Sequence, residues 1–423
     1  MVSRAVGAVA LFVLAASSAL AQVPPNAPGD PGMGGMSGPG HPGNPTEGSP
    51  SVDPMLGSGN SLSGTSGARF WFEGGYQAGF IRDLPTPAVI ATRGGAFAVR
   101  GAPGVSTVLG GGNTDVGTLS GARFTGGFWL DSNRSFGLEA SVFFLAEKSA
   151  SMSAGGNGAA LSRPFFDTSI QAQNVRILNL PGQVSGSVST EVKSLLVGAD
   201  LGPVIRVIET DMITLDQLLY FRFLRLEESQ NVTDSVSPVG GAITFRGQSF
   251  RNASAAVSVR DSALALNNFY GGGAGLRLGI NPGRFSATLS GKIAVGGTSQ
   301  SLRLDGSTSL TGTGNDQTAA GGLLIPGSSN GRYNQTRLTY MPEFGAKVGY
   351  QITQSLGIYV GYNFLYMNDV GRPGNNFTNS VNPTQLPSSQ NFGVPFGPAA
   401  GAVQLQNSDF WMHTVGVGMN LKF

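Results

Sequence analysis

Residues 408–423, the last segment of the chain, alternate between apolar side chains and small or polar ones. One set of alternate positions carries almost entirely apolar side chains: Trp411, His413, Val415, Val417, Met419, Leu421 and Phe423. The intervening positions are small or polar over the half nearest the end. Because successive side chains of a strand point to opposite faces, this period predicts a β-strand with one apolar face.

The same segment ends on an aromatic residue, as the last strand of an outer-membrane barrel typically does so that the assembly machinery can recognise it. We therefore predict that barrel-assembly machinery binds the apolar positions nearest the end: Val417, Met419, Leu421 and Phe423. A strand of a soluble protein is the alternative for this segment taken alone.

The beginning of the chain predicts export. Arg4 supplies a positive charge, residues 5–16 are a short apolar stretch, and Ala19-Leu20-Ala21 fits a small-x-small cleavage pattern. The apolar stretch is too short for a membrane-spanning helix, which needs about 20 residues. We expect residues 1–21 to be a signal peptide and the mature chain to begin at Gln22.

Composition favours a membrane barrel over a soluble domain. Charged residues make up 12% of the chain, against roughly 25% in soluble domains. The 65 glycines are about twice the usual share, and a closed barrel accommodates glycine where strands bend or crowd. The formal net charge of +2 is too small to suggest nucleic-acid binding. Without cysteine, disulfides and thiolate chemistry are excluded.

Residues 22–66 are rich in Pro, Gly, Ser and Asn and have little charge. Such a composition cannot bury enough apolar surface to offset the entropy of ordering, which predicts a disordered periplasmic leader. We expect the barrel itself to comprise residues 67–423.

Segments of period two recur from residue 68 onward and predict the strands. They span 68–80, 120–131, 135–147, 191–202, 215–228, 268–280, 284–297, 336–350, 355–367 and the C-terminal segment. The connections after the second, sixth and eighth segments are tight, the one after the fourth is of medium length, and the other five are long. An up-and-down transmembrane barrel has short turns at one rim and long outer loops at the other. The predicted fold is therefore all-β, an antiparallel barrel of about ten strands with long extracellular loops; eight or twelve strands remain alternatives.

Charged residues recur on the side of these segments opposite the apolar one, where the lumen is expected. The lumen candidates are Arg69, Glu73, Arg123, Glu139, Asp200, Arg222, Arg277, Arg284, Lys292, Arg337, Glu343 and Lys347, and Glu147 shares their predicted facing. Charges of both signs favour a buried ion-pair lattice that nearly fills a small barrel. The excess of basic residues leaves open a conducting lumen that prefers anions.

The long loops contain apolar residues and prolines, which suggest ordered structure folded over the barrel mouth. The segments are 161–166, 177–181, 323–326 and 394–396. Loops of this kind commonly carry function, although self-packing that only shields the strand ends is the alternative.

Several segments resemble the bacterial outer-membrane family known as putative beta-barrel porins, seventh group. They are RSFGLEASVFFLAEKS (134–149), SRPFFD (162–167), NNFYGGGAGL (267–276), GGLLIPGSSNGRY (321–333), PEFGAKVGYQITQSLGIYVGYNFLYMNDVGRPG (342–374), VNPTQLP (381–387) and SDFW (408–411). The resemblance covers nearly all of residues 67–423 and implies an outer-membrane barrel. It implies little about what is transported, because fold does not settle function.

Catalysis, a cofactor and a bound metal are not expected. The chain has two histidines, His41 in the leader and His413 on the predicted lipid-facing side of the last strand. Ser408 lies on the opposite face from His413, so no local Ser–His pair is present. The chain lacks Cys, a His pair and an Asp-x-Asp repeat, which disfavours a metal site.

The sequence thus predicts an outer-membrane barrel in contact with lipid, with two functions left open. One is a porin for passive diffusion of small solutes, anionic ones included. The other is a plugged barrel that serves the envelope structurally or binds partners through its loops. The oligomeric state does not follow from the sequence.

Overall fold

The computed structural model describes residues 68–398, 403 and 405–423. The predicted signal peptide, 1–21, and leader, 22–66, lie outside the described residues.

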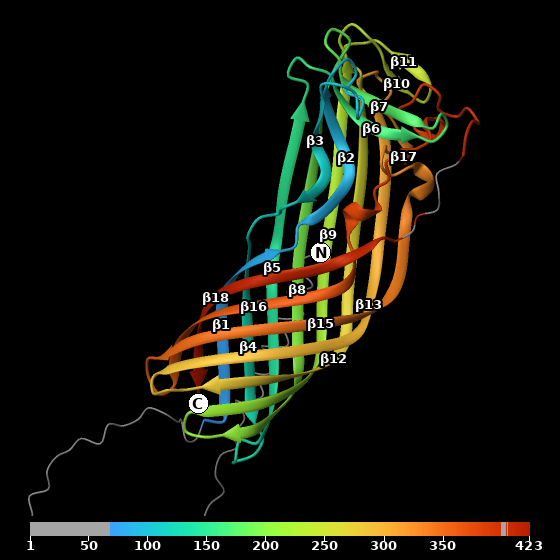
Figure 1. Ribbon diagram of the computed structural model, residues 1–423. Helices are drawn as coiled ribbons and strands as arrows, with labels where there is room; N and C mark the ends of the chain where they lie inside the picture. Colours follow the sequence, from blue (N-terminus) through green and yellow to red (C-terminus); the bar gives the residue numbers. More distant parts are fainter. Residues whose placement is uncertain (1–67, 399–402, 404) are drawn as a thin grey trace, which may run out of the picture. The chain divides into compact units, whose positions relative to one another are not determined.

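Within the described residues, ten antiparallel strands close into a ring (Figure 1). They are β1 (Phe70–Ile81), β4 (Leu119–Trp129), β5 (Phe136–Gly155), β8 (Val184–Glu209), β9 (Ile213–Pro238), β12 (Ala256–Ile280), β13 (Phe285–Thr311), β15 (Gly331–Gln351), β16 (Leu356–Gly371) and β18 (Asn407–Lys422). Each strand pairs with the next ring strand along the chain, and β1 pairs with β18 from Trp71↔Lys422 to Ile81↔Met412. The predicted all-β, ten-stranded, up-and-down barrel is confirmed.

Short and long connections alternate around the ring. Residues 130–135, 210–212, 281–284 and 352–355 make the short ones, and we call their side the turn end. Residues 82–118, 156–183, 239–255, 312–330 and 372–406 make the long ones, at the loop end. The expectation of a medium connection after the fourth strand is wrong, because β8 continues to Glu209 and leaves only residues 210–212 to reach β9.

The outer face near the turn end is apolar and exposed, as a surface in contact with lipid requires. Its large side chains include Phe72, Tyr76, Phe124, Phe136, Leu219, Phe221, Leu276, Leu289, Val295, Leu338, Tyr340, Phe344, Val360 and Val417. We call this surface the lipid band. Glu147 was expected to point inward but is exposed, because the register of β5 shifts between Leu145 and Lys148 and reverses the facing beyond it.

Several strands continue well beyond the lipid band toward the loop end. β8, β9, β12 and β13 have 25 to 27 residues, whereas about 9–11 suffice to cross a bilayer. β16 pairs with β15 only from Glu343↔Leu365 to Gln351↔Gly357, and β4 stops pairing with β5 at Gly121↔Leu145. Above these points the ring opens into a curved sheet of β5, β8, β9, β12, β13 and β15 (Figure 1).

The long connections fold over the inner face of this open sheet and form what we call the cap, residues 82–118, 156–183, 239–255, 312–330 and 372–398. Figure 1 shows most of its small strands gathered at the loop end. Its elements are β2 (Leu84–Gly94), β3 (Val105–Thr114), β6 (Leu161–Asp167), β7 (Ala172–Asn179), β10 (Ile243–Phe245), β11 (Gln248–Phe250), β14 (Gln317–Ala320), η1 (Gly327–Ser329), η2 (Pro373–Asn376), β17 (Ser380–Val381) and η3 (Pro383–Gln385). Among the described residues, no helix has the length and apolar content needed to cross a membrane.

Apolar packing joins the cap to the open sheet. Leu161, Leu178 and Leu324 of the cap share one buried cluster with Val232 and Val257 of the sheet. The loop segments expected to be ordered therefore do fold onto the barrel, except that Val394 and Phe396 are exposed.

Fully buried ion pairs also join the cap to the sheet. Arg163 of β6 donates to Asp234 of β9 and Asp261 of β12, both at 2.8 Å, and all three side chains are inaccessible. Arg372, just after β16, donates to Glu228 of β9. Burial raises the pKa of the Asp261 and Glu228 carboxyls, and the arginines offset part of that effect.

The close approach of β12 and β13 depends on a glycine at one position of the ladder. This dependence gives the first testable prediction. A Cβ at Gly271 would lie 2.5 Å from the carbonyl oxygen of Val295, whereas one at Gly272 would meet nothing within 4 Å. We expect Gly271→Ala to lower the free energy of unfolding by about 2 kcal/mol and the adjacent Gly272→Ala to change it by less than about 0.5 kcal/mol. Urea unfolding of both variants in detergent measures this; equal effects would contradict the close approach of the two strands at Gly271.

The turn 130–135 gives a prediction about acid stability. The backbone N–H groups of Phe136 and Ser135 donate to the Asp131 carboxylate at 2.9 Å, and these bonds lower its pKa. A carboxyl with a lowered pKa in the folded state adds stability above its unfolded pKa of about 3.9, and this is lost as pH falls through the folded value. Asp131→Ala should therefore unfold more easily than the native protein at pH 7, with the difference shrinking below pH 4. A difference that stays constant from pH 7 to pH 2 would refute the role of this carboxylate.

Candidate functional site in the barrel lumen

Among the described residues, two cavities that share part of their lining lie in the lumen on the turn side. The wider one has a volume of about 550 Å³ and is lined in part by turn residues such as Thr210, Asn281 and Gln354, so it opens at the turn end. The narrower one, about 140 Å³, lies deeper, and both are lined by Glu73, Glu139, Arg277 and Lys347. We call the wider cavity the vestibule.

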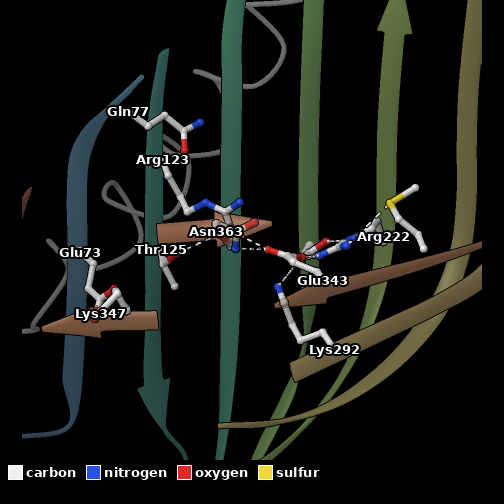
Figure 2. A network of polar contacts seen from close by, with 12 residues as sticks. Glu73, Gln77, Arg123, Thr125, Arg222, Lys292, Glu343, Lys347 and Asn363 are labelled. Atoms are coloured by element: carbon white, nitrogen blue, oxygen red, sulfur yellow. Dashed lines mark hydrogen bonds and ion pairs between the residues drawn. The ribbon is translucent and has the colours of Figure 1, made fainter. Parts of the chain in front are cut away.

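A central ion-pair network crosses the lumen at the deeper cavity (Figure 2). Glu343 of β15 accepts from Arg123 at 3.2 Å and Asn363 at 2.7 Å, and it also pairs with Arg222 and Lys292. Its side chain and that of Arg222 are at most 1% exposed. Five different strands supply these residues, so the network links distant parts of the wall.

Asp200 of β8 completes the central network. Its carboxylate accepts from Arg222 at 2.6 Å and from Lys292 at 3.0 Å. The network thus holds three cations, Arg123, Arg222 and Lys292, against the carboxylates of Asp200 and Glu343. Arg222 and Lys292 also lie over the ring of Tyr220, at 5.1 and 5.3 Å from its centroid, which adds cation–π attraction.

A second network lines the wall of the vestibule. Arg277 donates to Glu139 at 2.7 Å and pairs with Asp216 at 3.2 Å, and Asp216 also accepts from Arg206 at 2.8 Å. Trp71 donates its indole N–H to Glu139 at 3.2 Å. A separate pair joins Lys347 and Glu73 nearby (Figure 2).

Most of the predicted lumen charges thus come together in these contacts, and three do not. Arg69 precedes β1 and is exposed, and Arg284 is exposed in the turn 281–284, where it lines the vestibule. Arg337 is exposed on β15 above the last β15–β16 pair, where β13 still pairs with β15 but β16 no longer does.

Sequence reasoning missed three members of the second network. Arg206 lies beyond the predicted end of its strand at residue 202, and Trp71 was not considered as a hydrogen-bond donor. Asp216 was within a predicted strand and has the same even numbering as Arg222, so the period of two could have identified it.

Above the central network, an apolar layer fills the lumen. Every ring strand contributes at least one buried apolar side chain to one continuous cluster. These side chains, which we call the sealing layer, are Ile81, Leu119, Leu145, Leu196, Leu224, Phe269, Ala294, Met341, Leu365, Phe410 and Met412. None is more than 6% exposed. The deeper cavity therefore has buried apolar side chains on its loop side.

His413 lies on the outside of the ring, as expected. Its Nδ1 atom is hydrogen-bonded to the Tyr362 hydroxyl, and its ring packs near those of Phe364 and Trp411. Aromatic and amphipathic rings on the outer face are typical of the membrane interface.

The sequence comparison agrees with this architecture. The family model described as "Putative beta barrel porin-7" matches residues 81–423. The chain belongs to this family. It is therefore an outer-membrane barrel of a porin-like family. A comparison with curated proteins finds no match.

Solved barrel structures align with most of the chain, but their sequence identities and TM-scores are low. The outer membrane protease OmpT from Escherichia coli has 8% identity, covers 84% of this chain and 97% of its own, and gives a TM-score of 0.36. The attachment invasion locus protein Ail of Yersinia pestis, in complex with a heparin analogue, has 8% identity, 84% and 99% coverage, and a TM-score of 0.22. An anion-selective porin from Comamonas acidovorans has 8% identity, 84% and 98% coverage, and a TM-score of 0.17. Likeness at this level carries no argument about activity.

The central network predicts unequal effects for two lumen cations. Lys292→Ala leaves the carboxylates of Asp200 and Glu343 with one cation fewer in a buried site, which should lower the free energy of unfolding by about 3 kcal/mol. Arg284→Ala, in the exposed turn, should change it by less than about 0.5 kcal/mol. Urea midpoints of both variants in the same detergent provide the measurement, and equal losses would exclude a structural role for the network.

Proposed function

We propose that this barrel is closed to solutes in the state described here, and that it acts at the cell surface through its cap. The observation that supports this most directly is the sealing layer, to which all ten strands contribute. Apolar constrictions exclude water and ions because charged solutes lose their hydration there. A solute in the vestibule would have to displace packed side chains to go further.

On the loop side of the sealing layer, the cap is fixed to the open sheet. The cap is joined to the open sheet by a buried apolar cluster and by the ion pairs of Arg163 and Arg372. The apolar contacts supply most of the resistance to a movement of the cap, because an ion pair adds little net stability when both partners can return to water. A sealing layer and a cap that are both held by apolar packing favour a plugged barrel over a permanently open one.

A surface role fits the features of the cap. Ile170 in the turn between β6 and β7 and Val394 and Phe396 in the last long connection are large apolar side chains more than half exposed. Asn382 donates its side-chain N–H groups to the carbonyl oxygens of Phe396 and Pro398 and thereby fixes the backbone of that connection at residues 396–398. Exposed apolar residues mark a contact surface where they lie together, and a Cβ at Gly397 would lie 3.0 Å from Ser169, so the two segments that carry them are neighbours.

An anion-preferring porin is the second candidate function. The central network, with three cations against two carboxylates, supports this preference if the sealing layer is displaced. Passive diffusion would then depend on a conformation other than the one described.

Single-channel recording in planar bilayers distinguishes the two candidates. The native protein should show no discrete steps. Phe269→Ala/Phe410→Ala removes two of the largest fully buried side chains of the sealing layer and should produce anion-preferring currents, weakened by a further Lys292→Ala. The control is Phe221→Ala/Phe344→Ala, which removes the same chemistry from the lipid band and should stay silent.

Folding of each variant is checked by heat-modifiability on gels. Reproducible anion-selective steps from the native protein would overturn the closed-barrel proposal in favour of the porin. A folded sealing-layer variant that stays silent would show that the cap alone is sufficient to close the lumen.

A further inference from the structure

Two arginines lie directly opposite each other on the outer face of the open sheet. Arg303 of β13 and Arg332 of β15 are register partners in the antiparallel ladder. Their strand neighbours Leu302, Leu304 and Tyr333 pack into the interior, so both arginines point outward. The Arg303 side chain is 59% exposed, and Arg332 is exposed as well.

This arrangement is electrostatically unfavourable for the protein alone, because like charges directly opposite on neighbouring strands repel. Asp305 lies 3.7 Å from Arg303 and is 54% exposed, so it offsets one of the two charges at most. Arg225, by contrast, has its own close partner in Glu227 at 2.7 Å. The Arg303–Arg332 pair therefore has an uncompensated positive charge.

Polar side chains beside Arg303 and Arg332 add further hydrogen-bond donors to the same surface. Ser301 and Asn334 are the next register partners on the same outer face, toward the lipid band. A phosphate or carboxylate placed there can accept from two guanidinium groups, a hydroxyl and an amide. Arginine favours these anions because its planar fork matches their oxygens.

The position on the strand indicates where such an anion comes from. The lipid band ends at Val295 on β13 and at Leu338 on β15, which are exposed apolar residues. With about 3.3 Å per residue and a strand tilt near 40°, the arginines lie roughly 15–20 Å beyond the acyl region. An ordinary phospholipid headgroup layer is only about 5–8 Å deep, so a headgroup that reaches the arginines has to extend further, as one built of several sugars does.

We propose that Arg303 and Arg332 bind an anionic headgroup, phosphate or carboxylate, of an outer-leaflet glycolipid. The site is continuous with the lipid band on the same two strands, and its charge is complementary to such a headgroup. The bound anion relieves the repulsion between the arginines and ties the open sheet to the leaflet beside it. This site is independent of the lumen and of the proposed closure.

The test compares the full native chain in detergent with Arg303→Gln/Arg332→Gln, using lipopolysaccharide as the probe. The double variant should bind it roughly thirtyfold more weakly, which corresponds to about 1 kcal/mol for each basic side chain at an anionic surface. Lipopolysaccharide should raise the unfolding temperature of the native protein but not that of the variant. Without lipopolysaccharide the variant should be at least as stable as the native protein, because the repulsion is gone.

Controls separate this site from general attraction and from free anions. Arg225→Gln removes an outward arginine that already has a partner, and it should leave binding within about twofold of native. Dephosphorylated lipopolysaccharide should bind more weakly to the native protein where a phosphate is the bound group and equally well where a carboxylate is. Inorganic phosphate should not compete at millimolar concentration. Equal binding by the double variant, or full competition by inorganic phosphate, would overturn the proposal.

Discussion

The lack of hydrogen-bond partners in the bilayer is the constraint on which the rest of this structure depends. Each backbone N–H and C=O group at that depth has to be paired within the protein, and only a closed ring of strands achieves this without an edge. Here the ring closes through β1 and β18, the first and last strands of the barrel. A ring of ten strands has a narrow interior, so inward side chains nearly fill it.

The filled interior is organised in successive layers. Charged residues that line the cavities lie nearest the turn end, the sealing layer follows, and the buried pairs of Arg163 and Arg372 lie beyond it under the cap. Buried ion pairs contribute little net stability compared with well-packed apolar residues, but removing one partner is costly. We infer that these pairs fix the position of the cap on the sheet, while apolar contacts supply most of its stability.

The sequence predicted the ring well because the lipid band repeats every two residues, most clearly in β16 from Leu356 to Tyr366. It predicted the strand extensions poorly for a physical reason. Beyond the bilayer the strands still alternate between apolar and polar side chains, but there the apolar side chains face inward and the polar ones outward. Val257 and Val259 face inward, for example, and Arg260 faces outward. A search for apolar residues facing outward therefore left out the loop-end part of the extended strands β5, β8, β9, β12, β13 and β15. The sequence predicted the ion-pair networks only in part. The period of two predicts that Arg222 and Glu343 face the lumen, but it does not predict that they meet across it.

The central claim, a lumen open to the turn end and sealed above it, is best tested by labelling single cysteines. The chain contains no cysteine, so each introduced thiol is unique. Thr288→Cys places a thiol between the two cavities, and Asn315→Cys places one in an exposed loop-end turn as the control for sidedness. In oriented vesicles, a membrane-impermeant thiol reagent should label residue 288 only from the turn side and residue 315 only from the loop side. Labelling of residue 288 from the loop side would contradict a sealed lumen.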